Sequence, residues 1–289
     1  MIAHLLTLEC ELTRLTLAPA IGASIVNWTL RSNGQALLRP SDAQAIASAS
    51  PRRLACYPLA PWSNRIAQGG FAGPDGWIAL APNSPNDPLP IHGSAWQHPW
   101  QLLDRSESQV ILQLECLVPF AYRALQRFRL YQGRLEMRLE VTHLDQRAAW
   151  HGLGWHPYFP RTAHTRVQAP AKRLWQADAG RLSTRLDPVP LAWDFSEAQP
   201  LPEQLLDNAF TGWNGECRII QEDFAYQLNC SSTGTEYYML YCPPQQNFFC
   251  FEPVTHPVNA HHLPGHPGLQ LLQQGQSARL DFNLHYQPT

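Results

Sequence analysis

Lysine is almost absent from this chain of 289 residues, because Lys172 is the only one. Charge of one sign is not in excess either, since 21 basic and 23 acidic residues give a formal net charge of −2. A strongly basic surface is therefore excluded, which disfavours nucleic acid and anionic membranes as partners. No apolar run approaches the length of a membrane span, and residues 1–10 lack the basic and then apolar pattern of a signal peptide.

Cysteine motifs are also missing. The seven cysteines are an odd number, and no two of them form a C-x-x-C pair. This usage fits free thiols in a reducing cytosol better than a disulfide framework. We therefore expect a cytoplasmic protein.

Helical periodicity is the third absence. No segment keeps a 3.6-residue apolar pattern over three turns, and 26 prolines argue against long helices. Period-two alternation is clear instead, for example at Val110, Leu112 and Leu114. The pattern predicts an all-β protein built as a large antiparallel β-sandwich. Because no linker or internal repeat interrupts it, we expect a single domain over residues 1–289.

Strands are predicted where apolar residues alternate between turn signals. Residues 5–31 are expected to form two or three strands that end at a hairpin turn, Asn33-Gly34, and a second hairpin turns at Gln132-Gly133. Further short strands are expected at 217–230, 237–242 and 280–286. Long or irregular loops are expected at 39–65, 69–100, 150–160 and 255–268. Residues 170–215 are expected to be rich in loops, with short elements near Leu174 and Leu182.

One short stretch, Phe248-Phe249-Cys250-Phe251-Glu252-Pro253, places a lone carboxylate in apolar company. Glutamate is costly to bury unless it is paired, and such conflicts tend to fall at functional sites. Apolar neighbours raise the pKa of a carboxyl group toward neutrality, where a proton-transfer group works best. The alternative interpretation is a strand end from which Glu252 reaches solvent.

Three further loops place a polar residue among aromatic residues and prolines, and these residues are Arg65, His92 and His156; Asp207 is a fifth candidate. Histidine and a glutamate of raised pKa make a natural acid–base pair. Each residue also has a structural interpretation. Either histidine could belong to the core or the surface, Arg65 could pair with a structural carboxylate, and Asp207 could cap a helix or turn.

Taken together and in order, these residues resemble a known family. The motifs are Asn64-Arg65-Ile66, His92-Gly93, His156-Pro157-Tyr158-Phe159, Asp207 before Phe210, and Phe251-Glu252-Pro253. This set is similar to the aldose 1-epimerase, or galactose mutarotase, family. The resemblance runs from about residue 20 to the C-terminus, and it is closest to a bacterial subgroup whose sugar preference is open.

The resemblance implies a galactose mutarotase-like β-sandwich that interconverts the α and β anomers of a free aldose. It implies that Glu252 is the general base and His156 the general acid of ring opening. Arg65, His92 and Asp207 correspond to substrate-binding residues. No cofactor and no metal are implied, and the expected partner is a hexose-type aldose bound by a monomer or homodimer.

Two other functions stay open. A mutarotase of sugar 6-phosphates would need two or more arginines near the cleft, and Arg52 and Arg53 precede the Arg65 loop. A non-catalytic carbohydrate-binding module could use the same sandwich, although the presence of both acid and base argues against it.

Four histidines cluster in the loop 256–266, and clustered histidines can bind metals. No cysteine or acidic residue falls between them. Three prolines, Pro257, Pro264 and Pro267, would hold the segment irregular. A structural loop at the edge of the cleft is therefore favoured over a metal site.

Overall fold

A computed structural model describes residues 4–85 and 87–289. Residues 1–3, which belong to the N-terminal segment without a signal-peptide pattern, lie outside this range. The expected single domain over residues 1–289 likewise includes residues 1–3 and 86, which are not described.

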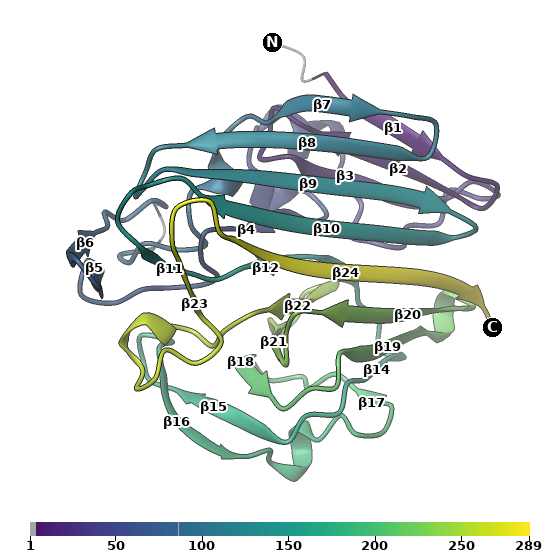
Figure 1. Cartoon of the computed structure of the whole chain (residues 1–289). Coiled ribbons are helices and arrows are strands. Elements are labelled where there is room, and N and C mark those ends of the chain that lie inside the picture. Colours follow the sequence, from purple (N-terminus) through teal and green to yellow (C-terminus); the bar gives the residue numbers. More distant parts are fainter. Residues whose placement is uncertain (1–3, 86) are drawn as a thin grey trace.

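The largest sheet has nine strands and is antiparallel throughout (Figure 1). Its central strands are long and continuous, as the alternating sequence predicted, and its hairpin of β9 and β10 turns at Gln132-Gly133. In spatial order the strands are β17 (Gln199–Pro200), β14 (Thr165–Gln168), β19 (Glu216–Gln221), β20 (Tyr226–Thr233), β24 (Ser277–Pro288), β10 (Arg134–His143), β9 (Tyr122–Tyr131), β8 (Gln109–Cys116) and β7 (Gln101–Arg105).

A second antiparallel sheet has eight shorter strands. Their order is β16 (Ser183–Pro188), β15 (Arg173–Ala177), β18 (Leu206–Thr211), β21 (Tyr237–Cys242), β22 (Phe248–Val254), β12 (Gly154–Trp155) and β4 (Pro58–Leu59), with β13 (Tyr158–Pro160) also beside β22. Apolar side chains of both large sheets share one buried cluster, which includes Phe128, Phe282, Leu240 and Phe249. The all-β, antiparallel sandwich predicted from the sequence is confirmed.

Smaller elements complete the fold. The N-terminal sheet consists of β1 (Leu6–Glu9), β2 (Thr13–Ala18) and β3 (Ser24–Leu30), and two strand pairs are β5 (Gly70–Gly73) with β6 (Gly76–Ala79) and β11 (Ala149–His151) with β23 (Gln270–Leu272). The α-helical content of the described residues is the short helix α1 (Ala43–Ala47). Single 3₁₀ turns are η1 (Pro51–Arg53), η2 (Ala95–Gln97), η3 (Leu191–Trp193), η4 (Glu222–Phe224) and η5 (Ala260–His262).

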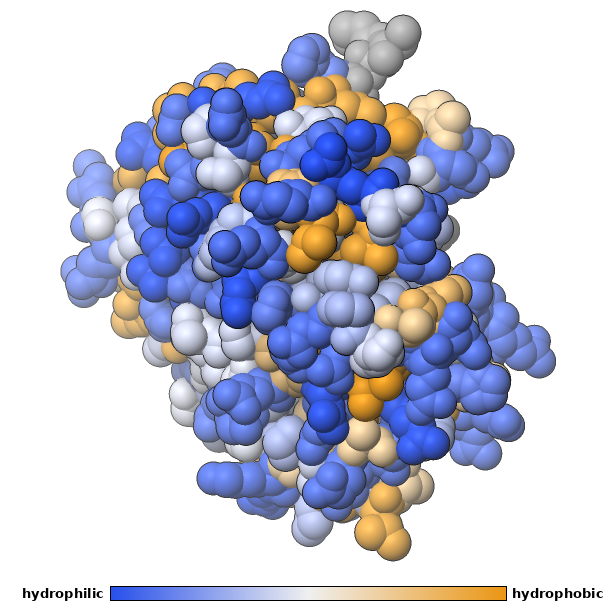
Figure 2. Space-filling view, turned by 90° about the vertical axis from the view of Figure 1, so that its right-hand side faces the viewer, coloured by the Kyte–Doolittle hydropathy of each residue, from blue (hydrophilic) through white to orange (hydrophobic). Residues whose placement is uncertain are grey.

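The surface and the interior differ as expected for a large core. The face of the molecule in Figure 2 is mostly hydrophilic, with hydrophobic residues in scattered groups. The buried residues are largely apolar and aromatic, among them Trp28, Trp155 and Phe210. Within the described residues, no helix is both long and apolar enough to cross a membrane.

Strand β22 contains the stretch Phe248 to Pro253 that the sequence singled out. One face of the strand packs on the core, and the other faces polar residues. Phe249 and Phe251 point into the main core cluster, whereas Cys250 belongs to a separate cluster on the opposite face. Because successive side chains on a strand alternate between faces, Glu252 lies on the same face as Cys250. Glu252 is buried, with 3% of its surface exposed. The alternative in which Glu252 reaches solvent is therefore wrong.

The neighbour of β22 is interrupted opposite Glu252. Strand β13 pairs with residues 248–250 and β12 pairs with Val254, so the ladder stops between them at His156-Pro157. Proline has no N–H to donate to a ladder, and Pro157 and Pro253 both lie at this gap. Pro253 also restricts Glu252 to extended backbone, which keeps its side chain on the same face as Cys250. The break lets His156 approach Glu252.

Two sequence expectations need correction. Asp207 was placed in a loop-rich region with a capping role as the alternative, but it lies inside strand β18 and pairs with Tyr241. The buried neighbours Leu206 and Phe210 explain the strand, because their burial outweighs the low strand preference of Asp-Asn. The turn at Asn33-Gly34 forms, and the chain after it lies against β3 through backbone hydrogen bonds and a bridge from Ala36 to Thr29, but it does not form a strand of its own.

The close approach of Gly93 to the loop after β4 can be tested by substitution. Its φ is +67°, and a Cβ at this position would lie 1.9 Å from the carbonyl oxygen of Ala60. We expect Gly93→Ala to lower the free energy of unfolding by about 3 kcal/mol or more, because the collision adds to the strain of the left-handed backbone. Urea unfolding measures the change. Gly34→Ala is the matched control, since Gly34 has φ +75° and open space around it, and it should cost only about 1 kcal/mol. Equal losses in the two variants would contradict this account.

Candidate active site

A cavity of about 260 Å³ opens on the face of the eight-stranded sheet that points away from the main core. All five residues predicted from the sequence line it: Arg65, His92, His156, Asp207 and Glu252. They come from segments far apart in the chain, namely the loop after β4, the loop before η2, the gap between β12 and β13, strand β18 and strand β22. The cavity wall also contains aromatic residues and three further arginines.

A larger hollow of about 550 Å³ lies elsewhere, on strands β10, β19, β20 and β24 of the nine-stranded sheet. Two of its charged residues, Arg134 and Glu216, are exposed to solvent. None of the five residues predicted from the sequence lines this hollow. The smaller cavity is therefore the candidate site.

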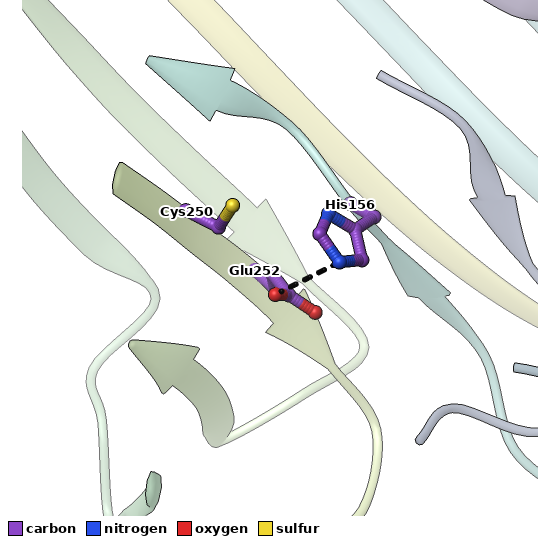
Figure 3. Close-up of side chains that lie close together, drawn as sticks. All are labelled: His156, Cys250 and Glu252. Carbon is purple, nitrogen blue, oxygen red and sulfur yellow. Dashed lines mark ion pairs between the residues drawn. The ribbon is translucent and has the colours of Figure 1, made fainter. Parts of the chain in front are cut away.

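His156 and Glu252 are in direct contact across the gap in the sheet. His156 Nε2 lies 3.3 Å from Glu252 Oε1, and Figure 3 shows the imidazole and the carboxylate facing each other. Both side chains are more than nine-tenths buried. Glu252 Oε2 and His156 Nδ1 have no hydrogen-bond partner among the described residues. One polar contact therefore serves two buried ionisable groups.

Burial acts on this pair in one direction. It raises the pKa of Glu252 well above its ordinary value, and Asp207 raises it further while Arg65 lowers it. Burial lowers the pKa of His156 to about 3, and the nearby Arg52 and Arg39 lower it as well. Both shifts favour the uncharged forms. With one proton on the pair, a protonated Glu252 facing a neutral His156 is therefore favoured in the unliganded site.

Two tyrosine rings hold the imidazole of His156. Tyr57 stacks on it with ring centroids 4.6 Å apart, and Tyr158 stacks on it with centroids 4.7 Å apart. The backbone N–H of His156 donates to the Tyr57 carbonyl at 3.0 Å. These contacts fix the ring plane, so Nε2 keeps its direction toward Glu252.

His92 has a defined tautomer. Its Nδ1 accepts a hydrogen bond from the backbone N–H of Asn64 at 3.0 Å. Burial lowers the pKa of His92 well below its ordinary value, so the ring is neutral and its proton is on Nε2. Asn64 and His92 both adopt left-handed backbone, with φ of +57° and +64°. Such strain in residues other than glycine is often found at functional sites.

Arg65 is held in place by Asp87. Its Nε and Nη2 lie 2.8 Å and 2.7 Å from Asp87 Oδ2, and its Nη1 donates to Asn64 Oδ1 at 3.2 Å. The structural interpretation of Arg65, a pair with a carboxylate, is therefore correct for part of its guanidinium. The residue lines the cavity at the same time.

Asp207 faces the cavity from β18, and its Oδ2 lies 3.4 Å from Nη1 of Arg181. Burial raises its pKa, and Arg181 and Arg65 oppose that rise. Its ladder partner Tyr241 is paired in turn with Cys250 of β22. This register places Asp207 two strands from Glu252 on the same face of the sheet.

The described residues contain one group of side chains with metal-ligand geometry, and it belongs to this site. One ligand atom each of His156, Cys250 and Glu252 lie within 4.8 Å of one another. A thiol binds zinc as thiolate, but burial raises the pKa of Cys250 well above its usual value. This set of donors therefore fits proton transfer between His156 and Glu252 better than metal binding.

The histidines of the loop 256–266 make separate structural contacts. His256 Nε2 accepts from the backbone N–H of Ser63 at 3.0 Å, and its Nδ1 donates to the carbonyl of Pro257 at 2.8 Å. Nε2 of His262 donates to the Gly70 carbonyl, and His266 stacks on Trp150. These contacts fasten the loop to the segment that carries Arg65, in agreement with the favoured structural interpretation.

Sequence reasoning missed several residues of the cavity wall. They are Arg39, Arg52, Tyr57, Arg181 and Tyr241, together with Asp87 behind Arg65. The sequence placed Arg52 and Arg53 just before the Arg65 loop, but it did not indicate which of them faces the cavity. In the structure Arg52 lines the cavity and Arg53 is exposed. Tyr158 was part of a recognised motif, which could have indicated a role beside His156.

Fold and site together define a β-sandwich with an acid–base pair in a polar cavity. The sequence model of the family described as aldose 1-epimerase matches residues 5–285. The uncharacterised protein YphB of Escherichia coli (strain K12) is 33% identical over 261 residues, which cover 86% of this chain and 88% of YphB.

Solved structures agree. A protein of Escherichia coli K12 described provisionally as an aldose 1-epimerase superposes with a TM-score of 0.92, 29% identity and 99% coverage of both chains. A galactose mutarotase-like protein of Clostridium acetobutylicum has the same fold, with a TM-score of 0.84, 16% identity, and coverage of 96% of this chain and 93% of that one. The chain belongs to the aldose 1-epimerase family. It is an isomerase of the mutarotase class and acts on a sugar.

Replacing Glu252 by the neutral isostere glutamine should stabilise the protein at neutral pH. Because the folded-state pKa of Glu252 is raised, its contribution to stability is complete below the unfolded-state pKa and is lost as pH rises through the folded-state pKa. We expect Glu252→Gln to raise the free energy of unfolding by about 1 kcal/mol at neutral pH, and the gain to vanish in mild acid. Urea unfolding across pH measures this difference. Glu107→Gln, at an exposed position, is the matched control. A Glu252→Gln variant less stable than wild type at neutral pH would contradict the raised pKa of Glu252.

Proposed function

We propose that this protein interconverts the α and β anomers of a free aldose with Glu252 as general base and His156 as general acid. The observation that carries the proposal is the 3.3 Å contact between His156 Nε2 and Glu252 Oε1 at the wall of the cavity. The two oxygens that exchange protons in ring opening are bonded to the same carbon, C1. An acid and a base that serve both must therefore lie side by side.

Ring opening uses the charged form of the pair. Glu252 takes the proton of the anomeric hydroxyl, and the Nε2–H of protonated His156 passes to the ring oxygen as the C1–O bond breaks. Hydrogen bonds from the sugar to the carboxylate, with Arg65 close by, stabilise this form during turnover. The products are an open-chain aldehyde, a protonated Glu252 and a neutral His156.

Ring closure uses the neutral form. Rotation about C1–C2 presents the other face of the carbonyl group to the ring hydroxyl. Neutral His156 then takes the proton of that hydroxyl, and protonated Glu252 delivers its proton to the carbonyl oxygen, which restores the starting pair. The number of protons on the pair is one before and after the cycle. Both transfers are made by side chains, so the reaction as proposed needs no cofactor.

The remaining predicted residues bind the sugar. His92 donates through Nε2–H, because its Nδ1 is occupied by Asn64. Arg65 donates through the part of its guanidinium that Asp87 leaves free, and Asp207 accepts hydrogen bonds from sugar hydroxyls. Together they position C1 at the acid–base pair.

We further propose a hexose-type aldose as substrate and the cytoplasm as the location. The seven cysteines are free and six of them are buried, which supports a reducing compartment. The state of assembly, monomer or homodimer, stays a prediction.

Glu252→Gln and His156→Asn should each lower the mutarotation rate at least about a hundredfold, because each removes one of the two proton transfers. Polarimetry on freshly dissolved sugar measures the rate over the buffer reaction, and circular dichroism checks the fold. His98→Asn, at an exposed histidine, should keep the wild-type rate. Near-wild-type rates in either site variant would show that the acid–base assignment is wrong. Sugar binding without any rate enhancement in the wild type would identify a binding module instead.

The pH profile should reflect a pair that works with one proton. A second proton must enter His156, whose pKa is lowered to about 3, so activity should fall in acid only near pH 3. Loss of the only proton should lower activity above the raised pKa of Glu252. Initial rates corrected for buffer catalysis give this profile. An acid limb with its midpoint near 6.5, the ordinary pKa of histidine, would contradict the proposed environment of His156.

A further inference from the structure

The charges around the cavity are not balanced. Four arginines line it, but only two of them have carboxylate partners: Arg65 pairs with Asp87, and Arg181 pairs with Asp207. Within residues 4–85 and 87–289, no carboxylate lies within ion-pair distance of Arg39 or Arg52. Proteins rarely bury or half-bury a cation without a counter-charge unless a ligand supplies it.

Arg39 is held in place at the cavity wall by hydrogen bonds and by an aromatic ring. Its Nη2 donates to the carbonyls of Arg52 and Leu54 at 2.7 Å and 2.6 Å, and its guanidinium carbon lies 3.6 Å from the centre of the Tyr158 ring. The two carbonyls account for Nη2 alone. The planar guanidinium keeps further N–H donors at Nη1 and Nε in a fixed plane.

Arg52 has no hydrogen bond from its side chain to any described residue. Its guanidinium carbon lies 5.2 Å from the centre of the Trp96 ring, and it is half-buried at the cavity wall. Since the 3₁₀ turn η1 places Arg52 toward the cavity and Arg53 toward solvent, two adjacent arginines have opposite surroundings. Among the described residues, the Arg52 side chain therefore has neither a carboxylate partner nor a hydrogen bond.

The two arginines lie on the His156 side of the cavity. Arg39 contacts Tyr158 and Arg52 contacts Trp96, and the rings of Tyr158 and Tyr57 stack on His156 while Trp96 packs against Tyr57. Arg39 and Arg52 both lower the pKa of His156, whereas the charges that act on Glu252 are those of Asp207 and Arg65. The uncompensated positive charge is therefore next to the group assigned to the ring oxygen.

We propose that Arg39 and Arg52 form a subsite for an anionic group on the substrate, a phosphate or a carboxylate carried at C6 of the aldose. The assignment to C6 rests on the proposed function, in which His156 protonates the ring oxygen. That oxygen joins C1 to C5, and C5 carries C6, so a group on C6 lies on the His156 side of the sugar. A neutral hydroxymethyl group leaves both cations without a counter-charge, whereas an anion accepts charge-assisted hydrogen bonds from them.

The anion would also assist the chemistry. Arg39 and Arg52 oppose the protonation of His156, and a bound negative charge offsets them. An anionic substrate therefore shifts the pair toward the charged form that ring opening uses. Recognition of the substrate and formation of the acid are coupled through the same two arginines.

The test compares three sugars by exchange between anomers at equilibrium, followed by NMR and corrected for the buffer rate: glucose, glucose 6-phosphate and glucuronate. We expect wild-type kcat/KM to be about tenfold or more higher for at least one of the anionic sugars than for glucose, and this preference to weaken as salt is raised. The anion with the higher value identifies the group, phosphate or carboxylate, that the subsite takes.

Arg52→Gln should reduce the ratio of kcat/KM for that anionic sugar to kcat/KM for glucose about tenfold. Arg53→Gln, the exposed neighbour, should leave the ratio unchanged. Equal kcat/KM for all three sugars, or equal ratios in Arg52→Gln and wild type, would overturn the subsite and leave the mutarotase proposal standing. No enhancement over buffer with any of the three sugars, combined with no effect of Glu252→Gln, would instead overturn the proposed function.

Discussion

The burial of Glu252 against His156 is the constraint on which the rest of this site depends. Each group alone would prefer water, and the two face each other at 3.3 Å. Desolvation drives both toward their uncharged forms, so a single proton is held between them. The two ways of placing that proton are the two states that opening and closing a sugar ring require. An environment that is costly for stability is in this way suited to moving a proton in either direction.

The sandwich provides this environment through the alternation of one strand and a break in its neighbour. Phe249 and Phe251 of β22 anchor the strand in the core, and the residues between and after them face the cavity. The ladder beside β22 stops at His156-Pro157, where the imidazole replaces a strand as the partner of Glu252. Loops from distant parts of the chain are then fastened around the cavity by specific bonds, such as that from Ser63 to His256. The core therefore sets the position of the carboxylate, and the loops set the position of its partners.

Much of this arrangement was predictable from the sequence, and the reason differs between residues. Glu252 was noticeable because a lone carboxylate in an aromatic run is a local conflict, and His156 because its motif lies in a known order with it. The hairpin of β9 and β10 followed from alternation around a glycine turn. Asp207 was misplaced, because its strand depends on contacts with β21 that local preference does not record. Arg39 and Arg52 were not recognised as a pair, because their contacts join segments through tertiary structure.

The central claim is that the buried pair holds its proton on Glu252 when the cavity has no sugar bound. Infrared difference spectroscopy between wild type and Glu252→Gln, at about pH 5.5, observes this carboxyl group directly, because an exposed glutamate is already ionised there. The account predicts the carbonyl band of a protonated carboxylic acid in the wild type that the variant lacks, and its decrease when a sugar binds. A carboxylate band from Glu252 in the sugar-free protein would contradict it.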